Sequence, residues 1–121
     1  IYTDLEGRVE HPNEAFCRMT GYSEPELLGL TVSTLTHPED HATDRAARDD
    51  TLAGRMSLHR VRKRYLAKGG EALWVRATVS LLRDDEGAPL RFVALIEDIS
   101  EQLRLEAAEH ARERAESSSR A

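Results

Sequence analysis

The chain has 121 residues and a mass of 13.6 kDa, which is the size of a single domain. Its 40% hydrophobic and 32% charged residues are typical of a globular domain and exclude a disordered or fibrous chain. The net charge of −5 argues against a nucleic-acid partner. No apolar run in this segment is long enough to span a membrane, and the single cysteine excludes an intramolecular disulfide.

Two short strands and a helix are predicted in the N-terminal region. Residues 4–7 have the composition of a turn, and they separate strand-like pieces at 1–3 and 8–10. Asn13 is a favourable N-cap for a short helix, and Gly21 is favourable just after its end.

Two further helices are expected before the period of the sequence changes. Ser23 and Glu26 form a capping box, a pattern that starts a helix, and Gly29 is expected to end it. Pro38 suits the first turn of a third helix because that turn does not need its missing N–H, and this helix could run to Gly54.

Alternating hydrophobic residues then indicate three strands, at 57–66, 73–81 and 90–99, joined by turns at 68–71 and 84–89. One face of the middle strand carries Leu73, Val75, Ala77, Val79 and Leu81, and one face of the last strand carries Phe92, Ala94 and Ile96. Together with the two N-terminal strands, they predict an α+β fold with a five-stranded antiparallel sheet and short helices on one face.

A C-terminal helix is predicted at 100–116, followed by a frayed tail at 117–121. The helical stretch has no Gly or Pro and consists mainly of strong helix formers. The helix could form a dimer through its thin apolar side, or it could be solvated and have no partner. The residues of the dimer seam would be Leu105, Ala108, Ala111 and Ala115.

Short motifs in order along nearly the whole chain resemble the PAS family with its C-terminal PAC motif. They are Asn13-Glu14-Ala15-Phe16, Thr20-Gly21-Tyr22-Ser23, Glu26-Leu27-Leu28-Gly29, His37-Pro38-Glu39-Asp40, Gly54, Arg62-Lys63-Arg64-Tyr65, Lys68-Gly69-Gly70, Trp74 and Asp98-Ile99-Ser100-Glu101. The resemblance implies a PAS/PAC sensory domain at 1–99 and a signalling helix at 100–116. It agrees with the sheet and helices predicted from the residues.

The family implies a pocket between the inner face of the sheet and the helices. An apolar lining would suit a small organic ligand or no ligand at all. The candidate lining residues are Phe16, Met19, Leu27, Leu28, Leu35, Leu52, Val79, Leu81, Phe92, Ala94 and Ile96.

Flavin and haem occur in some members of the family, but neither is predicted here. Flavin photoreceptors of this superfamily have a reactive cysteine just after the equivalent of Gly29, whereas residues 29–33 contain none and Cys17 lies in an earlier helix. In haem-binding relatives the ligand lies about where Thr43 stands, and His41 comes too early in the helix.

Other candidate chemistry has simpler explanations. His37, His41 and Asp44 share a helix face at metal-ligand spacing, but solvated histidines at a helix entry explain them better, so no metal site is predicted. The basic run from Arg60 to Arg64 alternates along a strand, which favours a solvated face or ion pairs over nucleic-acid contact. No catalytic signature is present, so the segment is not predicted to be an enzyme.

These features predict a sensory or regulatory module of a multidomain bacterial signalling protein; the alternative is a ligand-free domain for dimerisation or protein interaction. Ligand binding would act through Asp98, Ile99 and Ser100 on the C-terminal helix, and so on an output domain beyond residue 121, such as a histidine kinase, diguanylate cyclase or phosphatase.

We expect a homodimer in the full-length protein. A cytoplasmic location is expected because no signal is visible and the cysteine is unpaired. The absence of an initiating Met indicates a segment of a longer protein.

Overall fold

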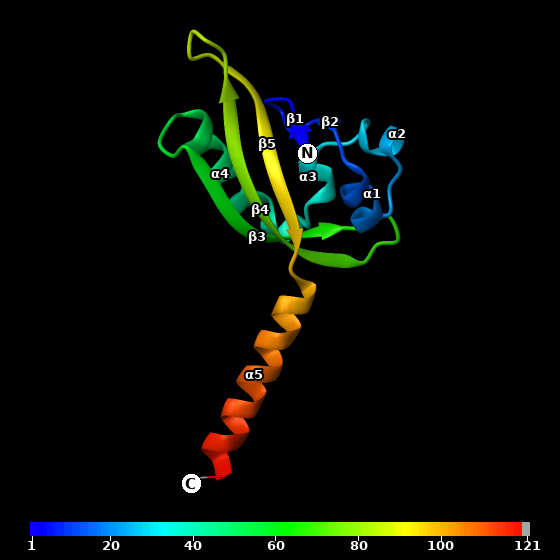
Figure 1. Cartoon of the computed structure of the whole chain (residues 1–121), viewed down its shortest axis with the longest axis vertical. Coiled ribbons are helices and arrows are strands. Elements are labelled where there is room, and N and C mark those ends of the chain that lie inside the picture. Colours follow the sequence, from blue (N-terminus) through cyan, green and yellow to red (C-terminus); the bar gives the residue numbers. More distant parts are fainter. Residues whose placement is uncertain (120–121) are drawn as a thin grey trace.

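A computed structural model describes residues 1–119 of the chain, with side chains through residue 117, and shows one twisted antiparallel sheet (Figure 1). Its strands are β1 (Tyr2–Thr3), β2 (Val9–His11), β3 (Leu58–Leu66), β4 (Ala72–Arg83) and β5 (Pro89–Asp98), in the order β2-β1-β5-β4-β3. The predicted five-stranded antiparallel sheet is confirmed.

The long strands β3, β4 and β5 form two hairpins whose register fixes the inner face of the sheet. Opposite residues pair across the strands, as in Ala77 with Ile96 and Val79 with Ala94. Since side chains alternate between the two faces of a strand, these residues share the inner face. The turn between β3 and β4 places Gly70 at a φ of 93°, a conformation that glycine adopts without strain.

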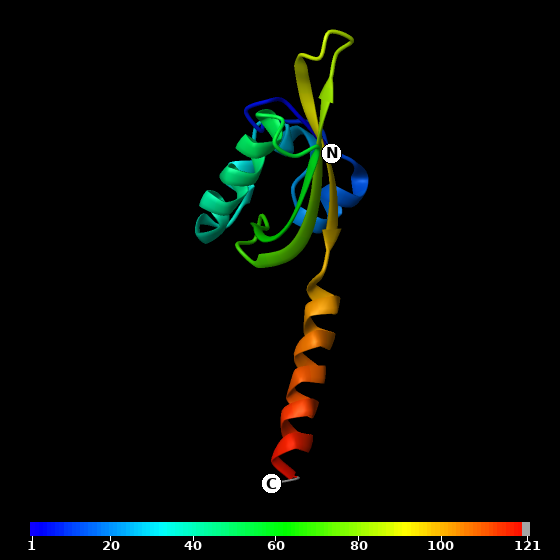
Figure 2. The same cartoon turned by 90° about the vertical axis from the view of Figure 1, so that its left-hand side faces the viewer.

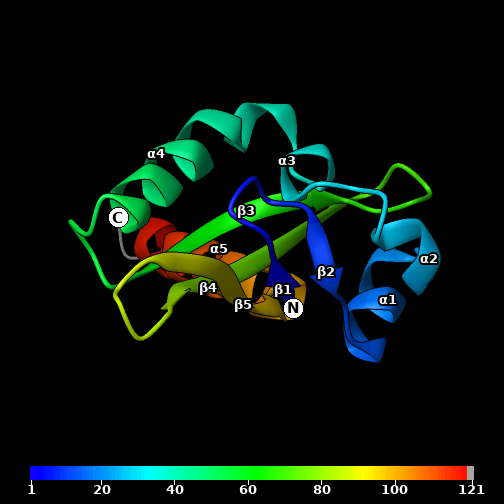
Figure 3. The ribbon, with the colours of Figure 1, turned by 90° about the horizontal axis from the view of Figure 1, so that it is seen from above.

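The helices precede the hairpins and cover the inner face (Figures 2 and 3). They are α1 (Glu14–Thr20), α2 (Glu24–Leu27), α3 (Val32–Leu35), the short 3₁₀ helix η1 (Pro38–Asp40) and α4 (His41–Leu52). Figure 3 shows α3 and α4 over the sheet, and α1 and α2 beside β2. The longest of them, α4, packs against β3 and β4 and so covers this part of the inner face.

The predicted helix signals act as expected. The side chain of Asn13 accepts a hydrogen bond of 2.8 Å from the Phe16 N–H, and Gly21 ends α1 at a φ of 80°. Ser23 and Glu26 form the capping box of α2. Hydrogen bonding from Lys68, and then from Ser23, lowers the pKa of the Glu26 carboxyl to about 2.

The hydrophobic core lies between α1, α2, α3 and the sheet. Its fully buried side chains come from helices and strands in equal measure, and they are Val9, Phe16, Leu27, Leu35, Tyr65 and Val75. Phe16 and Tyr65 meet edge to face, with ring centroids 5.9 Å apart, which is a favourable arrangement of two aromatic rings.

The C-terminal helix α5 (Ser100–Ser119) extends away from the domain (Figure 1). It runs past the predicted end at residue 116, so residues 117–119, which were predicted as part of the tail, belong to the helix. The sequence offers no Gly or Pro to stop the helix there, and serine is only a moderately weak helix former. Residues 120–121 of the predicted tail lie outside the described residues.

Candidate functional site

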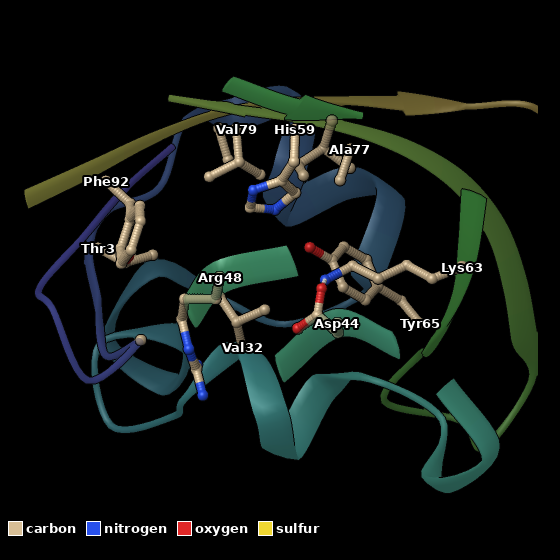
Figure 4. A pocket seen from close by; sticks show the side chains of 13 residues that line it. Thr3, Val32, Asp44, Arg48, His59, Lys63, Tyr65, Ala77, Val79 and Phe92 are labelled. Atoms are coloured by element: carbon tan, nitrogen blue, oxygen red, sulfur yellow. Dashed lines mark hydrogen bonds and ion pairs between the residues drawn. The ribbon is translucent and has the colours of Figure 1, made fainter. Parts of the chain in front are cut away.

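A small cavity lies between α4 and the inner face of β3, β4 and β5 (Figure 4). Its volume is about 40 Å³, which is room for a few water molecules or a very small organic molecule. One wall is apolar and is formed by the central strands, through Ala77, Val79, Phe92, Ala94 and Ile96.

Four of the predicted lining residues are among these: Val79, Phe92, Ala94 and Ile96. Two more, Phe16 and Met19, line a second small cavity on the α1 side, where Ala94 and Ile96 also contribute.

The other predicted lining residues lie elsewhere. Leu27 and Leu35 are fully buried in the core, and Leu52 and Leu81 are partly buried outside the cavity lining. The prediction for Leu28 is wrong, because its side chain is 45% exposed. It stands at the end of the single-turn helix α2, where one step along the helix turns a side chain by about 100° from its buried neighbour Leu27.

The second wall of the cavity is polar and was not predicted. It is formed by side chains of α4 and β3, with a buried ion pair at its centre. Lys63 Nζ lies 2.7 Å from Asp44 Oδ1, and their side chains are only 4% and 13% exposed. Burial lowers the pKa of Lys63, and the neighbouring Asp44 carboxylate opposes that shift. The ammonium also lies 5.1 Å from the centre of the Tyr65 ring, within the range of a cation–π contact.

His59 is the second buried polar group of this wall. Its Nδ1 lies 2.8 Å from the hydroxyl of Thr51, and the same hydroxyl lies 2.9 Å from the Ala47 carbonyl oxygen. A carbonyl has no hydrogen to donate, so the hydroxyl hydrogen goes to Ala47 and the proton between Thr51 and His59 belongs to Nδ1. Burial lowers the pKa of His59, which favours the neutral ring.

Arg48 stands on α4 at the rim of the cavity, beside the β1–β2 turn. A Cβ atom added to Gly7 would lie 3.2 Å from Arg48 Nη1, so glycine lets the guanidinium pass close to the turn. The positive charge of Arg48 contributes to lowering the pKa of both His59 and Lys63, which places it within electrostatic reach of both groups.

The signal for this polar wall was present in the sequence. The alternation that places Arg60, Arg62 and Arg64 on one face of β3 also places His59 and Lys63 on the other. On α4, the matching signal is the spacing of Asp44, Arg48 and Thr51 along one helical face. What the sequence could not show was that these two faces meet.

The base of α5 is held by side chains from the outer face of the sheet. Arg76 Nη2 donates to Gln102 Oε1 at 3.1 Å, and Arg62 Nη1 lies 3.5 Å from Glu106 Oε2. Hydrogen bonds from Gln102, and then from Arg62, lower the pKa of Glu106.

The predicted transmission residues lie at the junction of β5 and α5. The Asp98 side chain accepts a hydrogen bond of 2.9 Å from the Ser100 N–H. Ile99 is 2% exposed, and its N–H donates to the Trp74 carbonyl at 3.0 Å. Sheet and helix therefore meet without a flexible linker between them.

The basic run from Arg60 to Arg64 contains ion pairs, which is one of the two arrangements that the sequence favoured. Arg64 donates to both oxygens of Asp40 and also lies 3.0 Å from Glu39. These hydrogen bonds lower the pKa of Asp40. The guanidinium also stacks over the ring of Trp74, 5.1 Å from its centre. This cluster ties β3 to the start of α4.

The two histidines near α4 act through hydrogen bonds. His41 Nε2 contacts the backbone oxygens of Ser33 and Thr36 at 2.8 and 2.9 Å, and His37 Nδ1 accepts from the Glu39 N–H. In the part of the chain that the structure describes, no group of three or more His, Cys, Asp or Glu residues is arranged to hold a metal ion. No helix of the same part is long and apolar enough to cross a membrane.

The chain thus folds into an antiparallel sheet that encloses a cavity under covering helices and passes directly into a helix. The sequence profile of the PAS fold family matches residues 9–96, so the chain belongs to the PAS family. Among solved structures, a PAS domain from Colwellia psychrerythraea superimposes with a TM-score of 0.76 at 20% identity, covering 84% of this chain and 85% of that chain. The predicted family and fold are confirmed.

Two curated relatives match most of the chain and carry the names of signalling proteins. The probable diguanylate cyclase DgcE of Escherichia coli (strain K12) is 41% identical over 101 residues, which are 84% of this chain and 9% of that protein. The sensor histidine kinase TmoS of Ectopseudomonas mendocina is 32% identical over 102 residues, covering 84% of this chain and 10% of that protein. The chain therefore spans about a tenth of these relatives and is a sensory module of the kind that they contain.

Proposed function

We propose that this PAS domain is a non-catalytic sensor that holds a small organic ligand in the cavity under α4 and reports its presence through α5. The proposal rests on one observation: of two adjacent residues in the same strand, one points into the cavity and the next points to α5 on the opposite face of the sheet. Ala77 lines the cavity, and Arg76 beside it contacts α5 from the outer face. Lys63 and Arg62 repeat this arrangement on β3.

Movement of the inner side chains therefore acts on the strands that hold α5. A ligand that packs better against one position of β3 and β4 than against another shifts the population of the two arrangements. The change then reaches the helix through two polar contacts and through the buried Ile99. Because α5 follows β5 directly, its direction depends on the sheet.

The output that α5 would control belongs to the longer protein. The names of the two relatives, a diguanylate cyclase and a histidine kinase, support an enzymatic domain after the helix. We propose a cytoplasmic domain without haem or flavin, whose ligand is small because the cavity of about 40 Å³ is small. An absorption spectrum of the purified chain without haem or flavin bands would agree with this proposal.

Ligand binding is tested by a thermal-shift screen of small metabolites against the 121-residue chain. Compounds that raise the melting temperature are measured again on Ala94→Leu, which fills the cavity, and on Ala46→Leu, which adds the same atoms to an exposed position of α4. We expect the shift to be lost in Ala94→Leu and kept in Ala46→Leu. If no compound shifts the melting temperature, the sensor proposal fails and the ligand-free interaction domain replaces it.

We also propose that α5 pairs with its copy in a homodimer. Its seam residues are exposed in the single chain, and they are Leu105, Ala108, Ala111 and Ala115. Light scattering over rising protein concentration should show association that Ala108→Glu abolishes and Ala107→Glu, one step around the helix, preserves. A monomer at every concentration would contradict pairing through α5 in this chain.

A further inference from the structure

The polar wall of the cavity contains hydrogen-bond donors for which the described residues provide no acceptor. An ammonium has three N–H donors, and Lys63 uses one of them, on Asp44. Tyr65 is 1% exposed, and its hydroxyl has no hydrogen-bond partner among the described residues. Burial raises the pKa of Tyr65 well above its usual range, so the hydroxyl keeps its proton and remains a donor.

Arg48 adds a positive charge without a counterion. Its guanidinium makes no hydrogen bond or ion pair within the described part of the chain, although it lies at the cavity. Asp44 compensates only one of the two cations, Lys63, and the neutral His59 contributes no charge. The polar wall therefore has a net charge of about +1, and it stands in a partly desolvated site where charges interact more strongly than in water.

Two groups of the wall accept hydrogen bonds: the Asp44 carboxylate, which pairs with Lys63, and the neutral ring of His59. Its Nδ1 donates to Thr51, so its Nε2 has a free lone pair, and within the described residues no group donates to that atom. Figure 4 shows the His59 ring extending into the cavity from the sheet, with Arg48 and Asp44 on the opposite side. The site thus combines several donors, a net positive charge and, beside the Asp44 carboxylate, a neutral acceptor on His59.

Building on the sensory function above, we propose that the ligand is a small hydroxy monocarboxylate. Its carboxylate accepts hydrogen bonds from Lys63, Arg48 and the Tyr65 hydroxyl, and its own hydroxyl donates to His59 Nε2. One negative charge balances the wall, and charge-assisted hydrogen bonds are the strongest that such a site can form. The short hydrocarbon part of the ligand packs against Ala94 and Ile96 on the apolar wall.

Three acids and three matched probes test the ligand class. Glycolate, lactate and 2-hydroxybutyrate are titrated into the isotope-labelled chain, and backbone amide NMR shifts are followed. We expect saturable binding of at least one acid with a Kd of about 1 mM or lower. Relative to lactate, propionate lacks the hydroxyl donor, pyruvate replaces it with an acceptor, and propane-1,2-diol lacks the carboxylate. Each is expected to bind about tenfold more weakly or not at all.

Arg48→Gln tests the charge without disturbing the buried ion pair. We expect it to weaken binding of the acid by about tenfold or more, because it removes a charged donor. The matched control is Arg45→Gln, which removes an exposed arginine from the same helix and should leave the Kd unchanged. The NMR spectra themselves show whether each variant is folded.

The outcomes separate this inference from the sensor proposal. If none of the three acids binds saturably, or if propane-1,2-diol binds as well as lactate, the ligand is not a hydroxy acid. Should neutral compounds from the thermal-shift screen then still bind and lose binding in Ala94→Leu, the sensor proposal stands with a different ligand class. If neither set binds, both proposals fail.

Discussion

At the scale of single residues, the ion pair between Lys63 and Asp44 places charge where the apolar residues of most cores would lie. Two ions removed from water stabilise a fold only when they compensate each other. Their contact of 2.7 Å does this, and it joins α4 to the inner face of β3. Each partner therefore depends on the other.

Lys63→Met is expected to lower the free energy of unfolding by about 3–5 kcal/mol, because it leaves the Asp44 carboxylate buried without its partner. The double variant Lys63→Met with Asp44→Leu replaces the pair by apolar groups and should recover most of that loss. Urea denaturation followed by circular dichroism measures both. A single variant that costs less than about 1 kcal/mol would show that the pair is solvated in solution.

His59 should make stability depend on pH near neutrality. Its pKa in the folded chain lies below the ordinary histidine value of about 6.5, with burial as the main cause; Asp44 opposes the shift, and the positive charges of Lys63 and Arg48 add to it. As the pH falls from about 6.5 toward the folded pKa, the unfolded chain binds more protons than the folded one, so the free energy of unfolding decreases. Above about 6.5 this contribution is fully present.

The pH dependence is measured by urea denaturation between about pH 5 and 8, in the wild type and in His59→Asn. An asparagine keeps a donor for Thr51 but does not titrate, so the loss of stability on going from about pH 7 to 5.5 should be smaller in the variant. Equal slopes in the two proteins would mean that His59 titrates alike in the folded and unfolded states.

The residues of the apolar wall could be predicted, whereas those of the polar wall could not. Alternation along β4 and β5 places Val79 and Phe92 on the inner face whichever helix covers them. Lys63 is different, because a lysine on a strand is usually solvated. Its burial depends on Asp44 on a helix 19 residues earlier, and this contact is set by how α4 crosses the sheet.

At the scale of elements, the short helices depend on their caps. The helix α1 spans Glu14–Thr20, too short to be stable by itself in water, and Phe16 anchors it in the core. The Asn13 side chain satisfies one of the free N–H groups at its start. Cap and anchor together hold this helix in place.

Asn13→Ala should therefore lower the free energy of unfolding by about 1 kcal/mol, because the Phe16 N–H loses its acceptor. Asn13→Asp is the matched control: it keeps an oxygen at the same place and should retain the stability of the wild type within a few tenths of a kcal/mol. Thermal or urea unfolding compares the three proteins. If Ala and Asp behave alike, the cap does not contribute in solution.

Elements with strong local signals were predicted, and an element without them was missed. Asn13, the capping box at Ser23 and the glycine turns all specify backbone geometry within a few residues. The helix α3 (Val32–Leu35) is a single turn that begins with the β-branched Val32, so its threonine N-cap was a weak signal by itself. It forms because Thr31 caps it and because Leu35 is buried in the core.

At the scale of the whole molecule, α5 is attached to the sheet through contacts at the base of the helix. Its first turns contact the sheet through Gln102 and Glu106, whereas every residue from 107 to 117 is exposed. A helix without tertiary contacts derives little stability from its own hydrogen bonds. The attachment to the sheet therefore determines both the direction of α5 and how far its order extends.

Hydrogen exchange measures this attachment. In the wild type, amide protection should be highest in the first turns of α5 and fall toward its end, as helices fray where no tertiary contact holds them. Arg76→Met removes the contact with Gln102 and should speed exchange in the first turns by a few-fold. Arg60→Met, an exposed arginine of the same sheet face, is the control and should change nothing in α5. Unchanged exchange in Arg76→Met would mean that the contact with Gln102 does not hold the helix, and that the buried Ile99 and the pair of Arg62 with Glu106 fix it instead.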